Sequence, residues 1–244
     1  MQFESVGLKE MDRVKLMDRK DSKFTFNQEQ LPDLLEKLKE HYNILEIDGE
    51  RLMHYSNYYY DTKDFSLYQR HHNKHLNRYK IRKRKYSISD QSYLEIKFKS
   101  NKSRTIKNRT KISEFSKNLD VNLKKYINEN SPLDPENLNM ILQVDFMRLT
   151  LAHKEFKDRA TIDLELNYQY KEDSHRYENL AIAELKEDKS ASGSVFFNIL
   201  RESNINLGSF SKYCFGMLKL HPHLKNNLFK PKLRLLNKIL FTPS

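Results

Sequence analysis

Several short segments of this sequence carry a charged residue at every second position. They include YKIRKRKY (79–86), YLEIKFK (93–99), IKNRTKI (106–112), RATIDLEL (159–166) and IAELK (182–186). Successive side chains of a β-strand point to opposite faces, so each alternating set shares one face. In several segments the other face is apolar. Because cations and carboxylates recur over so many strands, we expect the charged faces to converge in a closed sheet with a charged lumen.

The balance of charge indicates an anionic partner. The chain has 244 residues, of which 32% are charged, and a net charge of +11. A basic protein attracts nucleic acid, anionic membrane or a phosphate compound, and composition does not choose among them. The chain is 38% hydrophobic and contains 14 Tyr and 14 Phe, so it can bury a core, which argues against disorder.

Cysteine content and hydropathy favour a soluble cytoplasmic protein. Cys214 is the only cysteine, so no intramolecular disulfide is possible. The N-terminus lacks the basic and apolar regions of a secretory signal, and no apolar run approaches the ~20 residues of a membrane span.

Turn residues and hydrophobic periodicity predict strands with helices inserted between them. Strands are expected at 16–26, 54–61, 76–87, 92–100, 104–115, 141–152, 157–168 and 180–187. Helices are expected at 7–14, 28–41, 62–73, 117–129 and 194–203, with a helical turn within 210–222. This order is typical of an α+β fold or an antiparallel barrel and not of a βαβ sheet.

Arg82 and Arg84 are the first candidates for binding an anion. Arginine keeps its charge and offers a planar fork that matches phosphate oxygens. Lys80, Lys83 and Lys85 crowd the same strand, and the register decides which charges point inward. A solvated strand face and a strand that binds nucleic acid remain alternatives, although no RNP1-like aromatic pattern is present.

Glu184 is the first candidate for binding a metal. It lies in the most apolar strand of the C-terminal half, where a carboxylate is costly unless it is paired or metal-bound. Oxygen ligands of this kind suit Mg²⁺ or Mn²⁺. Lys186 offers an ordinary ion pair as the alternative, and Asp163 and Glu165 are further candidates.

The usual phosphate-binding loops are missing from the sequence. Neither GxGxxG nor GxxxxGK[ST] occurs, and no GxSxG nucleophile elbow is present. A reaction that uses ATP would therefore have to grip the phosphates with side chains.

In order along the chain, these segments resemble the VTC domain, a polyphosphate polymerase domain of the triphosphate tunnel metalloenzyme (CYTH-like) superfamily. The resemblance is to stand-alone bacterial domains and covers about residues 3–222. The matching segments are DSKF (21–24), NYYYDTKDFSLYQRH (57–71), YKIRKRKY, YLEIKFK, IKNRTKI, FMRLTL (146–151), RATID (159–163), AELK (183–186) and FSKYCFG (210–216).

The resemblance implies an antiparallel eight-stranded β-barrel, the triphosphate tunnel, with a charged lumen and helices packed outside. It implies a divalent metal, Mn²⁺ or Mg²⁺, held by Glu184. It implies catalytic roles for Arg82, Arg84, Arg148 and Lys212. The residues expected to contact phosphates are Lys23, Arg82, Arg84, Lys97, Lys107, Arg109, Arg148, Arg159, Lys186 and Lys212.

The first strand departs from the pattern of many tunnel triphosphatases and class IV cyclases. Those proteins begin with ExExK, which supplies two metal-binding carboxylates. This chain has Arg19, Asp21 and Lys23 at that spacing. A cation in place of the first carboxylate argues against a triphosphatase or cyclase and favours the polymerase branch.

The resemblance therefore predicts an ATP–polyphosphate phosphotransferase, which moves the γ-phosphate of ATP to a growing polyphosphate chain and releases ADP. Its partners would be ATP and inorganic polyphosphate, with no specific nucleic acid. One alternative is a tunnel-type triphosphatase that hydrolyses a triphosphate or polyphosphate. The other is a non-catalytic binder of polyanions or nucleic acid.

The C-terminal segment forms a separate expectation. We expect a tunnel domain over 1–222 and a basic amphipathic segment over 223–244. A segment of this kind can touch a membrane or a membrane-associated partner protein. A helix packed on the barrel is the alternative.

Overall fold

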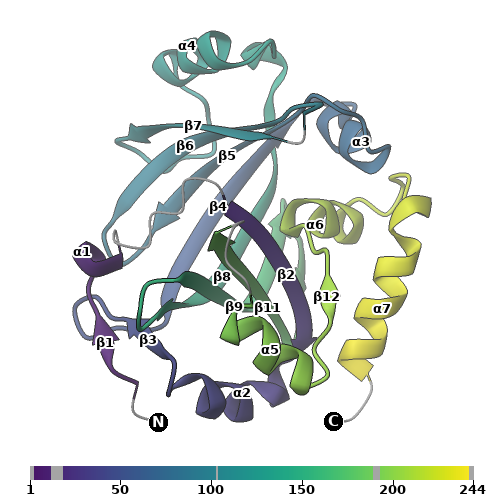
Figure 1. The fold of residues 1–244 in the computed structure, drawn as a ribbon. Helices are drawn as coiled ribbons and strands as arrows, with labels where there is room; N and C mark the ends of the chain where they lie inside the picture. Colours follow the sequence, from purple (N-terminus) through teal and green to yellow (C-terminus); the bar gives the residue numbers. More distant parts are fainter. Residues whose placement is uncertain (1–2, 12–18, 103, 189–192, 242–244) are drawn as a thin grey trace.

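The computed structural model describes residues 3–11, 19–102, 104–188 and 193–241. Within these residues the strands form one twelve-stranded sheet, which is strongly curled (Figure 1). The strands are β1 Ser5–Val6, β2 Arg19–Asn27, β3 Tyr42–Leu45, β4 Met53–Asp61, β5 Arg78–Tyr86, β6 Gln91–Lys99, β7 Thr105–Ile112, β8 Asn139–His153, β9 Asp158–Tyr170, β10 Asp173–Arg176, β11 Leu180–Asp188 and β12 Leu207–Gly208.

The main path of the sheet runs β12-β2-β11-β9-β8-β4-β5-β6-β7, and every pairing along it is antiparallel. The expected α+β class with a large antiparallel sheet is confirmed. The expected eight-stranded closed barrel is not found, because in the described residues no pairing joins β7 to β12 or β2. Short strands that the periodicity does not mark (β1, β3, β10 and β12) extend the sheet instead.

Several of the helices cover the outer face of the sheet. The α-helices are α1 Leu8–Met11, α2 Leu31–Leu38, α3 Ser66–His72, α4 Val121–Asn130, α5 Val195–Glu202, α6 Lys212–Leu220 and α7 Lys230–Phe241, with 3₁₀ turns at Gln28–Gln30, Pro135–Asn137 and Asn227–Phe229. Leucines of α2 and Phe196 of α5 pack with Phe24 and Phe26 of β2 in one cluster. In another cluster, α4 packs on β5 and β6. This packing fixes which residues of each strand face the other way.

Helix α6 packs on the opposite, inner side of the sheet. Its apolar residues share a core cluster with Leu142, Val144 and Tyr168 of β8 and β9. The contact is close at Gly216, where a Cβ atom would lie 2.6 Å from Tyr168 Cδ1 and 2.7 Å from Leu142 Cδ2. The absence of a side chain at Gly216 therefore sets how deeply α6 enters the curled sheet.

Helix α7 lies against the body of the protein. Leu236 is buried in the same cluster as α6, with Leu233 and Leu240 packed against it. Leu235 and Phe241 are exposed. In the described part of the chain, no helix combines the length and the apolarity that a membrane crossing requires. This packing accounts for part of the apolar side of α7. Two expectations stay predictions: the division of the chain at residue 222 and a membrane-associated partner.

Replacing Gly216 by Ala tests the depth at which α6 is seated. A Cβ at this position would meet the side chains of Tyr168 and Leu142, which have no exposed surface. Because neither can move easily, we expect a loss of about 2 kcal/mol in the free energy of unfolding. Denaturant unfolding measures this loss. Gly208→Ala is the matched control, because its nearest atom would be Thr25 Oγ1 at an ordinary 3.5 Å. Equal stability of the two variants would contradict the close packing of α6.

Candidate functional site

The register of the sheet brings the predicted strand residues onto one face. Lys23 lies opposite Glu184, Lys186 opposite Arg159, and Arg148 opposite Asp163. On the other half of the sheet, Arg82 lies opposite Glu95 and Lys97 lies opposite Lys107. We call this surface the charged face; its predicted residues are Lys23, Arg82, Arg84, Lys97, Lys107, Arg109, Arg148, Arg159, Glu184 and Lys186. The remaining predicted residue, Lys212, reaches it from the first turn of α6.

Glu184 lies between two lysines. One carboxylate oxygen contacts Lys23 Nζ, and the other accepts a hydrogen bond of 2.6 Å from Lys186 Nζ. Burial alone would raise the pKa of Glu184, but the two lysines outweigh it and hold the pKa well below its ordinary value. Burial lowers the pKa of Lys186, and Glu184 opposes this change.

Asp163 joins α6 to the sheet. Arg148 donates to it from Nε at 2.5 Å and from Nη2 at 2.7 Å, and Lys212 Nζ contacts the same carboxylate. Burial raises the pKa of Asp163, but the two cations outweigh this and lower it. Burial lowers the pKa of Lys212 to about 8 despite this partner, and Arg148 adds to the lowering. Lys212 is therefore a cation that is poorly stabilised without a further anion.

Glu95 is the buried carboxylate of the opposite half of the sheet. Arg82 donates to it from Nε at 2.8 Å and from Nη2 at 2.5 Å, and Lys107 Nζ lies 2.5 Å away. Burial would raise the pKa of Glu95, but its cationic neighbours outweigh burial and lower it. Arg82 also donates from Nη1 to the Tyr59 hydroxyl at 3.1 Å. These contacts fix the direction of the Arg82 guanidinium.

Three further cations of the charged face have no carboxylate partner among the described residues. Arg84 donates to Asn57 Oδ1 at 2.8 Å, and Lys80 donates to Ser211 Oγ at 3.1 Å. Lys97 lies directly between Lys80 and Lys107 on the neighbouring strands. Repulsion from Arg82, together with burial, lowers the pKa of Lys97 well below its ordinary value. The charged face thus holds more cations than its carboxylates can neutralise.

The curl of the sheet brings the two halves of the charged face close together at the start of α6. Burial lowers the pKa of Lys80 on β5, and Lys23 on β2 adds slightly to the lowering, although four strands separate β2 from β5 in the sheet. In a flat sheet these strands would be about 24 Å apart, beyond a Debye length. The start of α6 bridges them, because Lys80 bonds to Ser211 while Lys212 contacts Asp163. The sheet is therefore curled enough for one ligand to touch both halves.

Aromatic rings separate some of the cations. The ring of Tyr55 lies between the Arg84 and Arg148 guanidinium carbons, 5.4 Å and 4.9 Å from its centroid. Lys212 Nζ lies 4.6 Å from the centroid of Phe146. Such rings attract cations and hold them apart. The sequence analysis missed Tyr55 and Asn57, although the alternation in MHYSNYYYD places both on the face of Tyr59.

The register also decides which charges of β5 point inward. Lys80 joins Arg82 and Arg84, whereas Lys83 points to the outer face and donates to the carbonyls of Ser116 and Asn118. As a metal-ligand candidate, Glu165 would have to lie on the charged face, but it does not. A bulge with φ of 52° interrupts the alternation there, and Glu165 pairs at the surface with Arg176.

A metal site built from protein ligands alone does not fit the described residues. They contain no group of three or more His, Cys, Asp or Glu side chains that could hold a metal ion. Mg²⁺, however, is often held by one or two carboxylates together with substrate phosphates. Glu184 could take part in such an arrangement if bound phosphates replaced it as the partner of Lys23 and Lys186. Its role as a ligand of Mn²⁺ or Mg²⁺ remains a prediction.

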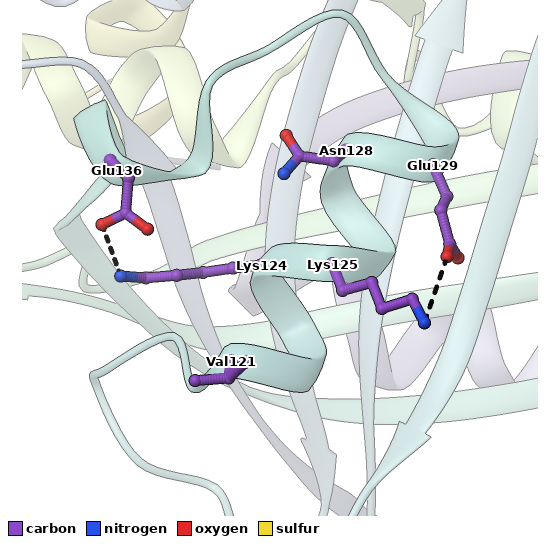
Figure 2. Close-up of a pocket in the computed structure, with 6 residues that line it drawn as sticks. All are labelled: Val121, Lys124, Lys125, Asn128, Glu129 and Glu136. Carbon is purple, nitrogen blue, oxygen red and sulfur yellow. Dashed lines mark hydrogen bonds and ion pairs between the residues drawn. The ribbon is translucent and has the colours of Figure 1, made fainter.

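A surface depression is lined by residues of α4 and by Glu136 (Figure 2), and α4 packs on the apolar side of β5 and β6. Its two lysines are already paired, Lys124 with Glu136 and Lys125 with Glu129. This depression is open and lacks a surplus of cations, so we do not assign the phosphate chemistry to it.

Comparison with known proteins agrees with these features. The model of the VTC domain family matches residues 18–221, so the chain belongs to the VTC domain family, as its motifs predict. No curated protein sequence matches the chain.

One solved structure shows a related fold, and two others are similar at lower TM-scores. A putative adenylyl cyclase from Hippeastrum, described as revealing a dominant triphosphatase activity, is 12% identical, with a TM-score of 0.50 over 86% of this chain and 98% of that chain. A putative adenylate cyclase from Vibrio parahaemolyticus is 10% identical, with a TM-score of 0.47 over 80% and 96% of the two chains. The PH1819 protein from Pyrococcus horikoshii OT3 is 17% identical, with a TM-score of 0.47 over 88% and 99%.

The lowered pKa of Lys212, at about 8, predicts how stability changes with pH. An unfolded lysine keeps its proton up to its ordinary pKa of about 10.4. Between these values the unfolded state binds more protons, so Lys212 makes stability rise with pH, by up to about 1.4 kcal/mol per pH unit. Denaturant unfolding at pH 8 and 9 should show a smaller rise for Lys212→Met than for the wild type. Lys238→Met, at an exposed position of α7, is the control and should keep the rise. An unchanged rise in Lys212→Met would contradict this environment for Lys212.

Proposed function

We propose that this protein is a polyphosphate polymerase that transfers the γ-phosphoryl group of ATP to the end of a growing polyphosphate chain. The observation that carries the proposal is the surplus of cations on the charged face of a curled sheet, in a chain of the VTC domain family. Arg84, Lys80 and Lys97 have no carboxylate partner among the described residues, and a row of phosphates would supply the missing negative charge.

Phosphoryl transfer asks the protein mainly for positioning and charge stabilisation. A terminal oxygen of the acceptor chain attacks the γ-phosphorus of ATP, the bond to the β,γ-bridging oxygen breaks, and ADP leaves with that oxygen. No side-chain nucleophile is needed. We assign Arg82, Arg84 and Arg148 to holding the transferring group in line. Arg82 and Arg148 are preoriented by their two-point contacts with Glu95 and Asp163.

The other predicted residues hold the phosphates on either side. Lys212 reaches the charged face from the N-terminal end of α6, where backbone N–H groups also favour negative charge. The remaining binding residues are Lys23, Lys97, Lys107, Arg109, Arg159 and Lys186. When bound, a divalent metal, Mn²⁺ or Mg²⁺, would neutralise phosphate charge beside Glu184.

Hydrolysis of a triphosphate is the second candidate, since the same cations could hold the substrate while water replaces the acceptor chain. In this chain the corresponding strand is β2, where Asp21 is the one carboxylate residue and lies opposite Lys186. The single carboxylate at that position favours transfer over the two-carboxylate arrangement of many tunnel triphosphatases.

Product analysis tests the proposal. The purified protein is incubated with ATP and Mn²⁺, and the products are followed by gel electrophoresis and phosphorus NMR. We expect long-chain polyphosphate together with ADP. Orthophosphate or tripolyphosphate without polymer would show the hydrolase instead, and intact ATP would contradict an enzymatic role for the isolated chain.

Glu184→Gln tests the metal assignment. The substitution keeps the size of the side chain and removes its charge, so we expect turnover to fall about a hundredfold or more while the far-UV circular dichroism is unchanged. Glu178→Gln is the matched control, since Glu178 is exposed on the loop before β11. Normal metal-dependent turnover by Glu184→Gln would remove the metal from this residue.

A further inference from the structure

The row of cations on β5 continues past the start of α6 to the end of the strand. Arg78, at the first position of β5, shares the face of Lys80, Arg82 and Arg84. Lys99 lies directly opposite Arg78 on β6, as Lys97 lies opposite Lys80. Like charges that face each other across a sheet repel. The surplus of cations thus extends along β5 from Arg84 to the first residue of the strand.

Helix α7 adds a cation at the same end of the sheet. The segment leading into α7 is fixed to α3, because the Leu228 N–H donates to His72 Nε2 at 3.3 Å and the Tyr68 hydroxyl donates to the Lys225 carbonyl at 2.8 Å. The start of α7 therefore lies beside α3, the helix that leads into β5 (Figure 1). Lys232, in the first turn of α7, lies over the ring of Phe229 at 5.9 Å.

The pKa of His71 on α3 is affected by all of these cations. The pKa of His71 is lowered to about 2, mainly by burial. Four cations add to the lowering: Lys80, Arg78, Lys232 and Lys99. The Nδ1 atom of His71 is buried and has no hydrogen-bond partner among the described residues. The imidazole is thus kept neutral within a strongly positive region.

We call Arg78, Lys99 and Lys232 the mouth cluster. In the described parts of the chain, none of the three forms an ion pair with a carboxylate. Arg78 donates one hydrogen bond to the His75 carbonyl at 2.8 Å. Lys99 and Lys232 are exposed. The cluster is open to solvent at one side and continuous with Lys80 at the other.

We infer that the mouth cluster binds the outer phosphates of an extended polyphosphate chain whose inner end lies on the charged face. The inference rests on the proposed function, because it takes polyphosphate as the ligand. It also gives a role to α7, which lies beyond the residues 18–221 that match the family model. A triphosphate held inside would be too short to use the cluster, whereas a longer chain would use it.

Two charge reversals on α7 test the inference. Lys232→Glu changes the mouth cluster, and Lys238→Glu makes the same change at an exposed position in the last turn of the same helix. The dissociation constants of tripolyphosphate and of long-chain polyphosphate are measured by calorimetry for both variants and the wild type. We expect Lys232→Glu to weaken long-chain polyphosphate about fivefold and to leave tripolyphosphate unchanged. Lys238→Glu should change neither.

The other results would overturn the inference. Equal affinity of Lys232→Glu and the wild type for long-chain polyphosphate would remove the mouth cluster from the binding path. An equal loss in Lys238→Glu would show an effect of net charge only. Neither result touches the proposed function, which fails separately if the wild type binds no polyphosphate or makes none from ATP.

Discussion

The charged face of the sheet carries more positive than negative charge, and the rest of the structure depends on that imbalance. Lys80, Lys97 and Lys107 lie directly opposite one another on three strands, where like charges destabilise the pairing. The apolar clusters on the outer face, formed with α2, α4 and α5, hold the strands in this register. The repulsion shows in the lowered pKa of Lys97. Under the proposed function, a bound polyphosphate would offset this repulsion, so the charges that repel one another would also provide the affinity for phosphates.

Helix α6 turns two sheet halves into one site. Asp163 and Ser211 tie its first turn to β9 and β5, and Gly216 lets it approach β8 and β9 closely. The curled sheet remains open between β7 and β12 in the described residues. The position of the two halves is therefore set by side chains of α6 and by helix packing, in place of a closed ring of backbone hydrogen bonds.

The alternation of charged and apolar residues was sufficient to predict the long strands, the α+β class and the shared face of Arg82, Lys97, Glu184 and Lys186. It could not predict the two-residue strands β1 and β12, which owe their pairing to neighbouring strands. It misplaced Glu165, because a bulge changes the side-chain period without a signal in the sequence. The partners of each cation also depend on tertiary distances, so the bridge from Lys80 to Ser211 could not be foreseen.

The most direct test of the central claim is the binding of tripolyphosphate to the wild type and to Lys97→Met, measured by calorimetry with duplex DNA as the competing polyanion. The account predicts one tripolyphosphate per chain for the wild type, weaker binding by Lys97→Met, and little displacement by DNA, because Arg84, Lys97 and Lys212 are buried or half-buried within the curled sheet. Equal binding by Lys97→Met, or displacement of tripolyphosphate by DNA, would contradict the claim that the charged face is built for a phosphate chain.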